Sequence, residues 1–434
     1  MKKRILRLSA LLLSILLLSL PLCSCASTGE PLLTLEADGK TYTYSVNLYE
    51  LYLSAVKGNL VAAGVTVNGA SASSAKYWNT IDTIDGKLQT VNEYYLAESL
   101  KECKYALTGL YLFDKYQLSL SSEENQKIED DLRELVLTDG NGSKNALNSK
   151  LSEYGVNYDM MREHYTNKLK ISAVQNYLYS LLGDNVKKEH LDENYVHFQQ
   201  IFLAGYHPVY MKDDNGDVIY YDSENDPLYK ETPFKETKNG VTVYYTDSSY
   251  THFSYDEEKG TPAPKINAAG TGYEREEMTQ EEAEVVEARA KQIETTLKNA
   301  SREDFEAAVK KESEDKTAVE TYTDGYYLKR NKTSDADWGN SYAIVLGALE
   351  SMKVDEVALV ETPDGYHIIK KYENTDKAYE KTENEAWFED FATDLTKKIY
   401  YEACEPYIAS VATDEALLET AKNMLQVPVN HFYY

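Results

Sequence analysis

Residues Val357 to Lys371 read VALVETPDGYHIIKK, and this stretch decides the fold of the second half of the chain. Two runs rich in β-branched and other apolar residues, Val357 to Glu361 and Tyr366 to Lys371, flank Pro363-Asp364-Gly365. Proline and glycine at the centre of such a segment indicate a turn, and the flanking residues favour extended backbone. The sequence therefore predicts two consecutive strands on either side of a tight turn.

The residues before this strand pair continue the pattern of a mixed domain. Val196 to Leu203 is β-rich and follows a helical region, so a new domain is expected to begin near residue 195. Two segments have the residues that cap the start of a helix: Thr279-Gln280-Glu281-Glu282 and Ser301-Arg302-Glu303-Asp304. Two further elements follow: a strand at Tyr326-Tyr327-Leu328, after the turn Asp324-Gly325, and a helix from about Ser341 to Met352. The elements then have the order β, α, α, β, α, β, β. This order predicts an α+β domain over residues 195–374.

A tyrosine-, aspartate- and glycine-rich segment, residues 206–278, interrupts this domain after its first strand. Asp213, Asn215 and Asp217 have the spacing that begins a calcium-binding loop, but Val218 stands where the loop needs glycine, so no metal site is expected. The segment is predicted to be a β-rich insertion with strand-like pieces at Val209–Met211, Val218–Tyr221, Val241–Tyr245 and His252–Tyr255.

Helical periodicity dominates both ends of the chain. Residues 47–190 carry apolar side chains at intervals of three and four, which predicts an all-helical region after a tether and short hairpin over residues 25–46. Residues 376–434 become helical again, with Trp387, Phe391 and Leu395 at helical spacing. Because each segment alone would expose an apolar stripe, we expect the two segments to form one domain.

The N-terminus has the pattern of an export signal. Lys2, Lys3 and Arg4 precede an apolar stretch from Leu8 to Leu22 that is too short to span a membrane comfortably. Ser24-Cys25 follows and resembles the lipobox of bacterial lipoproteins, which implies removal of residues 1–24 and lipid on Cys25. Two or more acyl chains anchor stably, so the chain is expected on the extracytoplasmic face of the cell membrane. The alternative is a secretory signal with incidental cysteines.

Charge, cysteines and motifs limit the remaining possibilities. A net charge of −27 makes nucleic acid an unsuitable partner and is compatible with cationic or unfolded polypeptides, or with a solvated acidic surface alone. Beyond the signal region, Cys103 and Cys404 either pair or remain separate buried thiols. The sequence has no G-x-S-x-G, H-E-x-x-H, C-x-x-C, phosphate-loop or dinucleotide pattern.

The order of elements from 195 to 374 resembles a parvulin-type peptidyl-prolyl isomerase domain. The residues that carry this resemblance are Gln200-Ile201-Phe202-Leu203 for the first strand, Ser313-Glu314-Asp315 after the second helix, and Gly365-Tyr366-His367-Ile368-Ile369-Lys370 for the closing strand. Together with the lipid anchor and helical flanks, the chain is similar to the PrsA and SurA class of exported foldases. The resemblance implies a helical chaperone-like domain built from both chain ends, and unfolded or proline-containing exported polypeptides as clients.

The resemblance also implies a set of site residues and no cofactor. His367 matches the second histidine of the parvulin site, Asp315 roughly matches its cysteine or aspartate, and Gln200 replaces its first histidine. Ser341 and Val345 fall near the methionine and phenylalanine of the proline pocket, and Phe202 is placed with them. A buried structural histidine is the alternative interpretation of His367.

Three functions are compatible with the sequence. The first is an extracytoplasmic foldase with prolyl isomerase activity, and the second is an inactive parvulin-like chaperone that only binds polypeptide. The third is a ligand-binding or structural lipoprotein of the cell envelope with a similar order of elements. The first two functions differ at the site, where Gln200, Ser341 and Val345 decide between activity and binding alone. The third function requires a deep polar pocket between two lobes.

Overall fold

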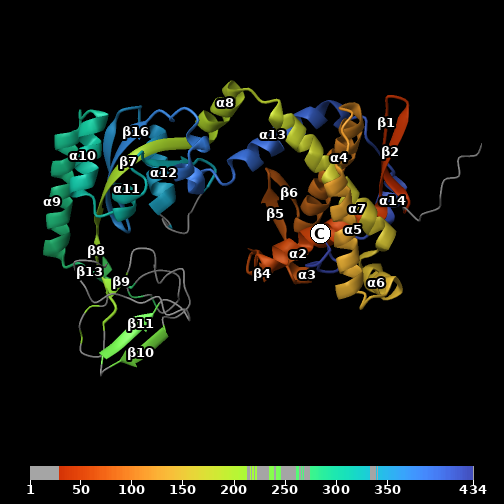
Figure 1. The fold of residues 1–434 in the computed structure, drawn as a ribbon, viewed down its shortest axis with the longest axis horizontal. Coiled ribbons are helices and arrows are strands. Elements are labelled where there is room, and N and C mark those ends of the chain that lie inside the picture. Colours follow the sequence, from red (N-terminus) through yellow and green to blue (C-terminus); the bar gives the residue numbers. More distant parts are fainter. Residues whose placement is uncertain are drawn as a thin grey trace, which may run out of the picture. The chain divides into compact units, whose positions relative to one another are not determined.

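The computed structural model describes residues 29–212, 216, 218, 220–221, 234–238, 241–245, 261–262, 265, 267, 274–332, 339 and 341–433. The predicted signal peptide and Cys25 therefore lie outside the described residues, as do Asp213, Asn215, Asp217 and the predicted strand at 252–255. The chain divides into unit 1, Met1–Leu182 with Thr393–Tyr434, and unit 2, Gly183–Ala392 (Figure 1). Among the described residues, no helix combines the length and apolar character that crossing a membrane requires.

Unit 1 is built mainly of helices around one hydrophobic core. Thr90 and Ser121 open two of these helices with capping boxes that include Glu93 and Glu124. The short strand β17 pairs with β1, so the C-terminal segment returns to the first strand of the unit. The helices are α2 (Val46–Ala62), α3 (Ala75–Trp78), α4 (Val91–Lys115), α5 (Ser122–Thr138), α6 (Lys144–Leu151), α7 (Tyr158–Ser180), α13 (Phe391–Ile408) and α14 (Glu415–Thr420), and the small sheet is β17 (Ala412–Thr413), β1 (Pro31–Ala37) and β2 (Lys40–Ser45).

Two short hairpins interrupt the region that was predicted to be entirely helical over 47–190, and the prediction is wrong there. The first joins β3 (Thr66–Val67) to β4 (Ala70–Ser71), and the second joins β5 (Ile81–Ile84) to β6 (Lys87–Thr90). Their turns are Asn68-Gly69 and Asp85-Gly86, and all four residues have positive φ between 48° and 76°. Such dipeptides form the tight turns that match the twist of paired strands, which explains why these residues leave the helix.

Cys103 on α4 and Cys404 on α13 are both free, buried thiols.

The end of the chain also departs from the helical prediction, because α14 ends at Thr420 and the described residues beyond it form turns and irregular backbone.

Unit 2 contains a four-stranded antiparallel sheet in the order β14-β7-β16-β15. The predicted α+β class is confirmed, and the predicted order of elements is present with one addition, the short helix α11. The strands are β7 (Tyr195–Ala204), β14 (Tyr326–Lys329), β15 (Val357–Thr362) and β16 (Gly365–Tyr372), and the helices are α8 (Asp184–Asn194), α9 (Gln280–Leu297), α10 (Arg302–Glu312), α11 (Lys316–Glu320) and α12 (Ser341–Ser351).

Helices cover both faces of this sheet, and two adjacent lysines of β16 mark the two layers. Nζ of Lys370 donates to the carbonyl of Ala300, in the link between α9 and α10, at 3.1 Å. Nζ of Lys371 donates to the carbonyls of Leu349 and Met352, at the end of α12, at 2.7 and 2.9 Å. Because successive side chains of a strand point to opposite faces, α9 and α10 cover one face and α12 covers the other (Figure 1).

The insertion contributes short antiparallel strand pairs. The pair β8 (Tyr206–Pro208) with β13 (Arg275–Glu277) forms its base, where the chain leaves and re-enters the domain. The described residues also include β10 (Phe234–Lys238) with β11 (Val241–Tyr245), and β9 (Tyr220–Tyr221) with β12 (Thr261–Pro262).

Candidate functional site

Three predicted site residues share one face of the unit 2 sheet. Phe202 of β7 lies directly opposite His367 of β16, and Gln200 lies opposite Ile369. The period of two along each strand therefore brings Gln200, Phe202 and His367 to the same face, which is the face that α12 covers. The ring centroids of Phe202 and His367 lie 4.8 Å apart.

The loop after α10 carries Asp315 to this face. Oγ of Ser313 accepts hydrogen bonds from the backbone N–H groups of Phe202 and Asp315, at 3.1 and 3.2 Å. The N–H of Glu314 donates to the carbonyl of Phe202 at 2.8 Å. Oδ1 of Asp315 then accepts from the N–H of Ala318 at 3.1 Å, as a cap of α11 does. The Ser313-Glu314-Asp315 segment is thus held against β7 by its own side chains and backbone.

These residues form a continuous set of side-chain hydrogen bonds, which we call the Gln200 network: Thr362, His367, Gln200, Asp315 and Tyr326. Nδ1 of His367 lies 2.8 Å from Oε1 of Gln200, and Nε2 of Gln200 donates to Oδ2 of Asp315 at 2.7 Å. The hydroxyl of Tyr326 donates to the same Oδ2 at 2.5 Å. Oγ1 of Thr362 lies 3.1 Å from Nε2 of His367.

The chemistry of the partners gives the network a direction. A carboxylate only accepts hydrogen bonds, so Gln200 presents its NH₂ group to Asp315 and its carbonyl to His367. Nδ1 of His367 must then carry the proton of the neutral ring, so Nε2, which lies 3.1 Å from Oγ1 of Thr362, is the unprotonated nitrogen. The arrangement therefore assigns one neutral tautomer to His367.

Burial favours this neutral state. Only 4% of the His367 surface is exposed. Burial lowers the pKa of His367 to about 4, although the carboxylates of Asp364 and Asp315 act in the opposite direction. Burial, together with the adjacent Asp315 carboxylate, raises the pKa of Tyr326 well above its ordinary value. Both side chains are thus uncharged at neutral pH.

The predicted pocket residues Ser341 and Val345 are buried in this structure. Ser341 is 2% exposed and its hydroxyl donates to Oδ2 of Asp364, in the turn between β15 and β16. Val345 has no exposed surface and packs in the core of unit 2. Of the three pocket residues named from the sequence, only Phe202 is partly exposed beside the Gln200 network.

Asp364 also joins the insertion to the site. Arg275 of β13 forms an ion pair with Oδ1 of Asp364, and its guanidinium group lies 4.0 Å from the ring centroid of Tyr206 on β8. Burial acts to raise the pKa of Asp364, but the hydrogen bonds from Ser341 and Arg275 outweigh it, so the pKa lies below its ordinary value. The base of the insertion is therefore fastened to the turn that precedes His367.

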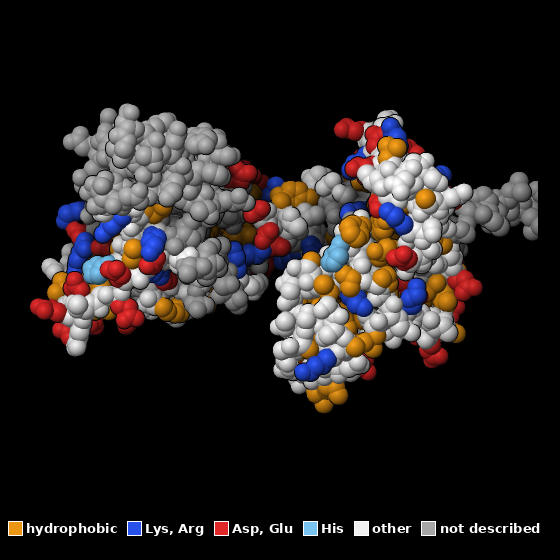
Figure 2. Space-filling view, turned by 90° about the horizontal axis from the view of Figure 1, so that it is seen from below, with side chains coloured by type: hydrophobic (Ala, Val, Ile, Leu, Met, Phe, Trp, Pro, Cys, Tyr) orange, Lys and Arg blue, Asp and Glu red, His pale blue; other side chains and the backbone are white. Residues whose placement is uncertain are grey.

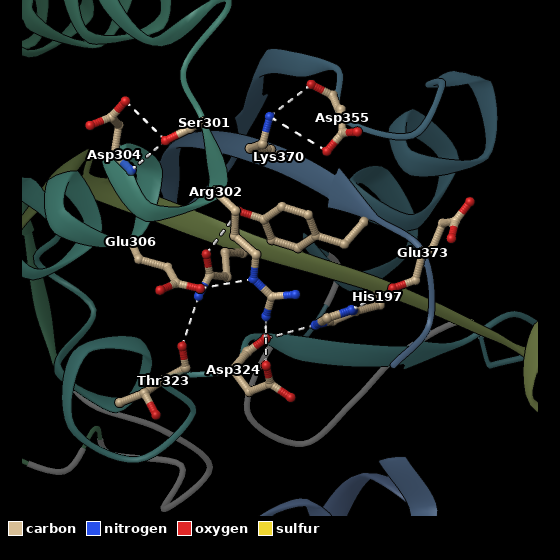
Figure 3. A network of polar contacts seen from close by, with 12 residues as sticks. His197, Ser301, Arg302, Asp304, Glu306, Thr323, Asp324, Asp355, Lys370 and Glu373 are labelled. Atoms are coloured by element: carbon tan, nitrogen blue, oxygen red, sulfur yellow. Dashed lines mark hydrogen bonds and ion pairs between the residues drawn. The ribbon is translucent and has the colours of Figure 1, made fainter. Parts of the chain in front are cut away.

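A second polar network lies on the opposite face of the sheet (Figure 3). The carboxylate of Asp324 accepts from Arg302 at 2.6 Å and from Lys381 at 2.9 Å. The two ring nitrogens of His197 lie 2.7 Å from the carbonyl of Asp324 and 2.9 Å from that of Glu373. This network fixes the turn that leads into β14, and so the start of the strand that carries Tyr326.

Sequence reasoning missed two members of the Gln200 network, Thr362 and Tyr326. Thr362 ends β15 in the segment that was quoted for its turn, and Tyr326 begins β14 just after Asp324-Gly325. Neither position carries a pattern that indicates a hydroxyl contact across the sheet. In the part of the chain that the structure describes, no group of three or more histidine, cysteine, aspartate or glutamate side chains could hold a metal ion.

Comparison with known families assigns a class to this arrangement. Residues 272–373 match the family model of the PPIC-type PPIase domain, also called rotamase. The predicted resemblance to a parvulin-type isomerase domain is therefore confirmed. The matched residues include Asp315, Tyr326 and His367, whereas Gln200 and Phe202 precede the insertion and lie outside the match.

Solved structures of PrsA proteins are similar to this chain. PrsA from Bacillus anthracis, described as a peptidylprolyl isomerase, has 14% identity and a TM-score of 0.22, with 74% of this chain and 98% of that chain covered. PrsA from Bacillus subtilis has 16% identity and a TM-score of 0.20, with 81% and 92% covered. The foldase PrsA from Streptococcus pneumoniae has 13% identity and a TM-score of 0.20, with 79% and 99% covered. No curated protein matches the chain in sequence.

Proposed function

We propose that this chain is a foldase that catalyses cis–trans isomerisation of X-Pro bonds in exported polypeptides. The observation that supports it most is the Gln200 network beside Phe202, where β7 pairs with β16, the last strand within the match to the PPIC-type PPIase domain. The clients we propose are unfolded or proline-containing exported chains.

This reaction needs little chemistry from the protein. Isomerisation breaks no covalent bond, and it is accelerated when the twisted amide binds better than either planar form. Neutral His367 lies with its ring against Phe202, and its two nitrogens face Gln200 and Thr362. In our proposal these residues give the X-Pro amide a fixed polar surrounding beside an apolar surface. No cofactor takes part in this scheme.

The activity we propose is slow. Gln200 stands where the resemblance implies a histidine, and Ser341 and Val345 have almost no exposed surface with which to hold a proline ring. Each 1.4 kcal/mol lost from transition-state binding slows the reaction roughly tenfold.

Holding of unfolded polypeptides without catalysis is the second candidate function, and exposed apolar side chains of unit 1 favour it. Figure 2 shows hydrophobic side chains distributed over the visible face of this unit, on the right of the view. Leu88 on β6 is 71% exposed and Ile81 on β5 is 62% exposed, and the pairing register places both on the same side of their hairpin. Apolar clients would bind such side chains through non-directional contacts.

Parallel assays of the full chain separate the two functions. One assay follows isomerisation of a proline peptide by a coupled protease, and the other follows aggregation of an unfolded client. The proposal predicts acceleration in the first assay and suppression in the second. Suppression without any acceleration supports the chaperone alone, and absence of both overturns the proposed function.

We also propose that lipid on Cys25 holds the protein at the extracytoplasmic face of the membrane, as its signal sequence suggests. Cys25→Ala should leave the protein released, or retained with its signal attached. Normal partitioning of this variant into the detergent phase would contradict the anchor.

A further inference from the structure

Tyr326 occupies a fixed position behind the Gln200 network. Its side chain is 2% exposed, and three aromatic neighbours surround its ring. The ring stacks on Phe198 at a centroid distance of 5.6 Å and meets the rings of Tyr322 and Trp387 at 5.3 Å each. The hydroxyl therefore has little freedom to move away from Asp315.

The hydroxyl of Tyr326 completes the set of donors around Asp315. Oδ1 of Asp315 accepts from the N–H of Ala318, and Oδ2 accepts from both Gln200 and Tyr326. A hydroxyl that donates to a carboxylate at 2.5 Å is at the short end of charge-assisted hydrogen bonds. A carboxylate only accepts hydrogen bonds, so both oxygens of Asp315 are occupied by donors of fixed position.

An ionised Asp315 selects one orientation of the Gln200 amide. If the amide turned over, its carbonyl would face the carboxylate, and its NH₂ group would face Nδ1 of His367. His367 would then have to carry its proton on Nε2. The orientation of Gln200 and the tautomer of His367 are thus set together by the charge on Asp315.

We propose that Tyr326 is a positioning residue that fixes the tautomer of His367 through Asp315 and Gln200. This inference rests on the proposed function, because it concerns the same site. It adds a residue that acts from behind the network, on the strand β14.

Tyr326→Phe in the full chain tests this inference, and Tyr372→Phe is the matched control. Tyr372 is also buried, and its hydroxyl donates to the side-chain oxygen of a glutamine, Gln199, at 2.9 Å, but on the opposite face of the sheet. Nitrogen-15 NMR of labelled histidine reports the tautomer, and a His367→Asn variant identifies the His367 signals.

In the natural chain, Nδ1 of His367 should have the nitrogen-15 chemical shift of a protonated ring nitrogen. Nε2 should have the chemical shift of an unprotonated one. Tyr326→Phe should convert this pattern into the other tautomer or a mixture, and it should lower kcat for a proline peptide at least tenfold with little change in KM. Tyr372→Phe should change neither the tautomer nor kcat.

An unchanged tautomer in folded Tyr326→Phe overturns the inference. If that variant does not fold, Asp315→Asn takes its place, because it removes the charge that orients Gln200, and an unchanged tautomer there also overturns it. Failure of the proposed function is a separate result: the natural chain would have no isomerase activity, while the NMR pattern would still report on Tyr326.

Discussion

Gln200 and His367 are 167 positions apart in the sequence, yet Oε1 of Gln200 lies 2.8 Å from Nδ1 of His367. The pairing of β7 with β16 produces this contact, since it places both residues on one face of the sheet. The insertion separates β7 from the rest of the domain in the chain. The polar part of the site is therefore complete only when the segment before the insertion joins the PPIC-type domain.

Stability should depend on pH through His367. Its pKa is about 4 in the folded protein and near the ordinary value of 6.5 in the unfolded chain. The unfolded chain therefore takes up a proton first as the pH falls. The stabilising contribution is complete above about pH 6.5 and is lost progressively toward pH 4, by roughly 3 kcal/mol for a shift of this size.

Urea unfolding at a series of pH values checks this dependence. His367→Gln, which does not titrate, should have a shallower loss of unfolding free energy between pH 6.5 and 4 than the natural chain. His431→Gln, at an exposed position outside unit 2, is the control and should behave as the natural chain does. If the unfolding free energy of all three proteins fell equally between pH 6.5 and 4, His367 would not be buried in its neutral form.

Enlarging Val345 should destabilise unit 2. This residue has no exposed surface, so Val345→Phe forces additional volume into a packed core and should lower the free energy of unfolding by roughly 1–3 kcal/mol. Val345→Ile, a smaller increase in volume, is the matched comparison and should have less effect. Unchanged stability in Val345→Phe, measured by urea unfolding, would mean that the side chain has access to open space, as a residue lining a proline pocket requires.

The features that were predictable from sequence are those with local or periodic signals. Thr279 with Glu282 forms the predicted capping box, and the β-rich composition of Val196–Leu203 and Tyr366–Lys371 correctly indicated strands. Asp315 and His367 were named from the resemblance, and the structure brings them together through Gln200.

The features that were missed depend on short segments or on packing. The hairpins at Asn68-Gly69 and Asp85-Gly86 have strands of only two to four residues, too short to show a period of two against the helical pattern around them. The hydroxyl contact of Tyr326 requires β14 to approach the loop after α10, and no local pattern encodes that approach. The burial of Val345 likewise follows from how α12 packs on the sheet.

The C-terminal segment should be required for the stability of unit 1. The hydroxyl of Tyr400 donates to the carbonyl of Tyr105 at 2.7 Å, and Nζ of the buried Lys57 donates to the carbonyl of Val427 at 2.8 Å. Deletion of residues 393–434 removes these partners and exposes the apolar side chains packed beneath them, so the thermal transition of unit 1 should shift to lower temperature.

Calorimetry of the shortened chain separates the two units. The transition of unit 2 should be retained, because residues 376–392 remain and pack on it through contacts such as Lys381 with Asp324 and Trp387 with Tyr326. A unit 1 transition that is unaffected by the deletion would contradict the view that both chain ends build one domain.

The most direct measurement is the rate of cis–trans exchange of a proline peptide, followed by NMR exchange spectroscopy with the full chain, its His367→Ala variant and a His431→Ala control. We predict that the natural chain and the control accelerate exchange above the uncatalysed rate, and that His367→Ala reduces this acceleration at least tenfold while the protein stays folded. Exchange at the uncatalysed rate with the natural chain, or equal acceleration by the natural chain and His367→Ala, would contradict a prolyl isomerase site built around His367.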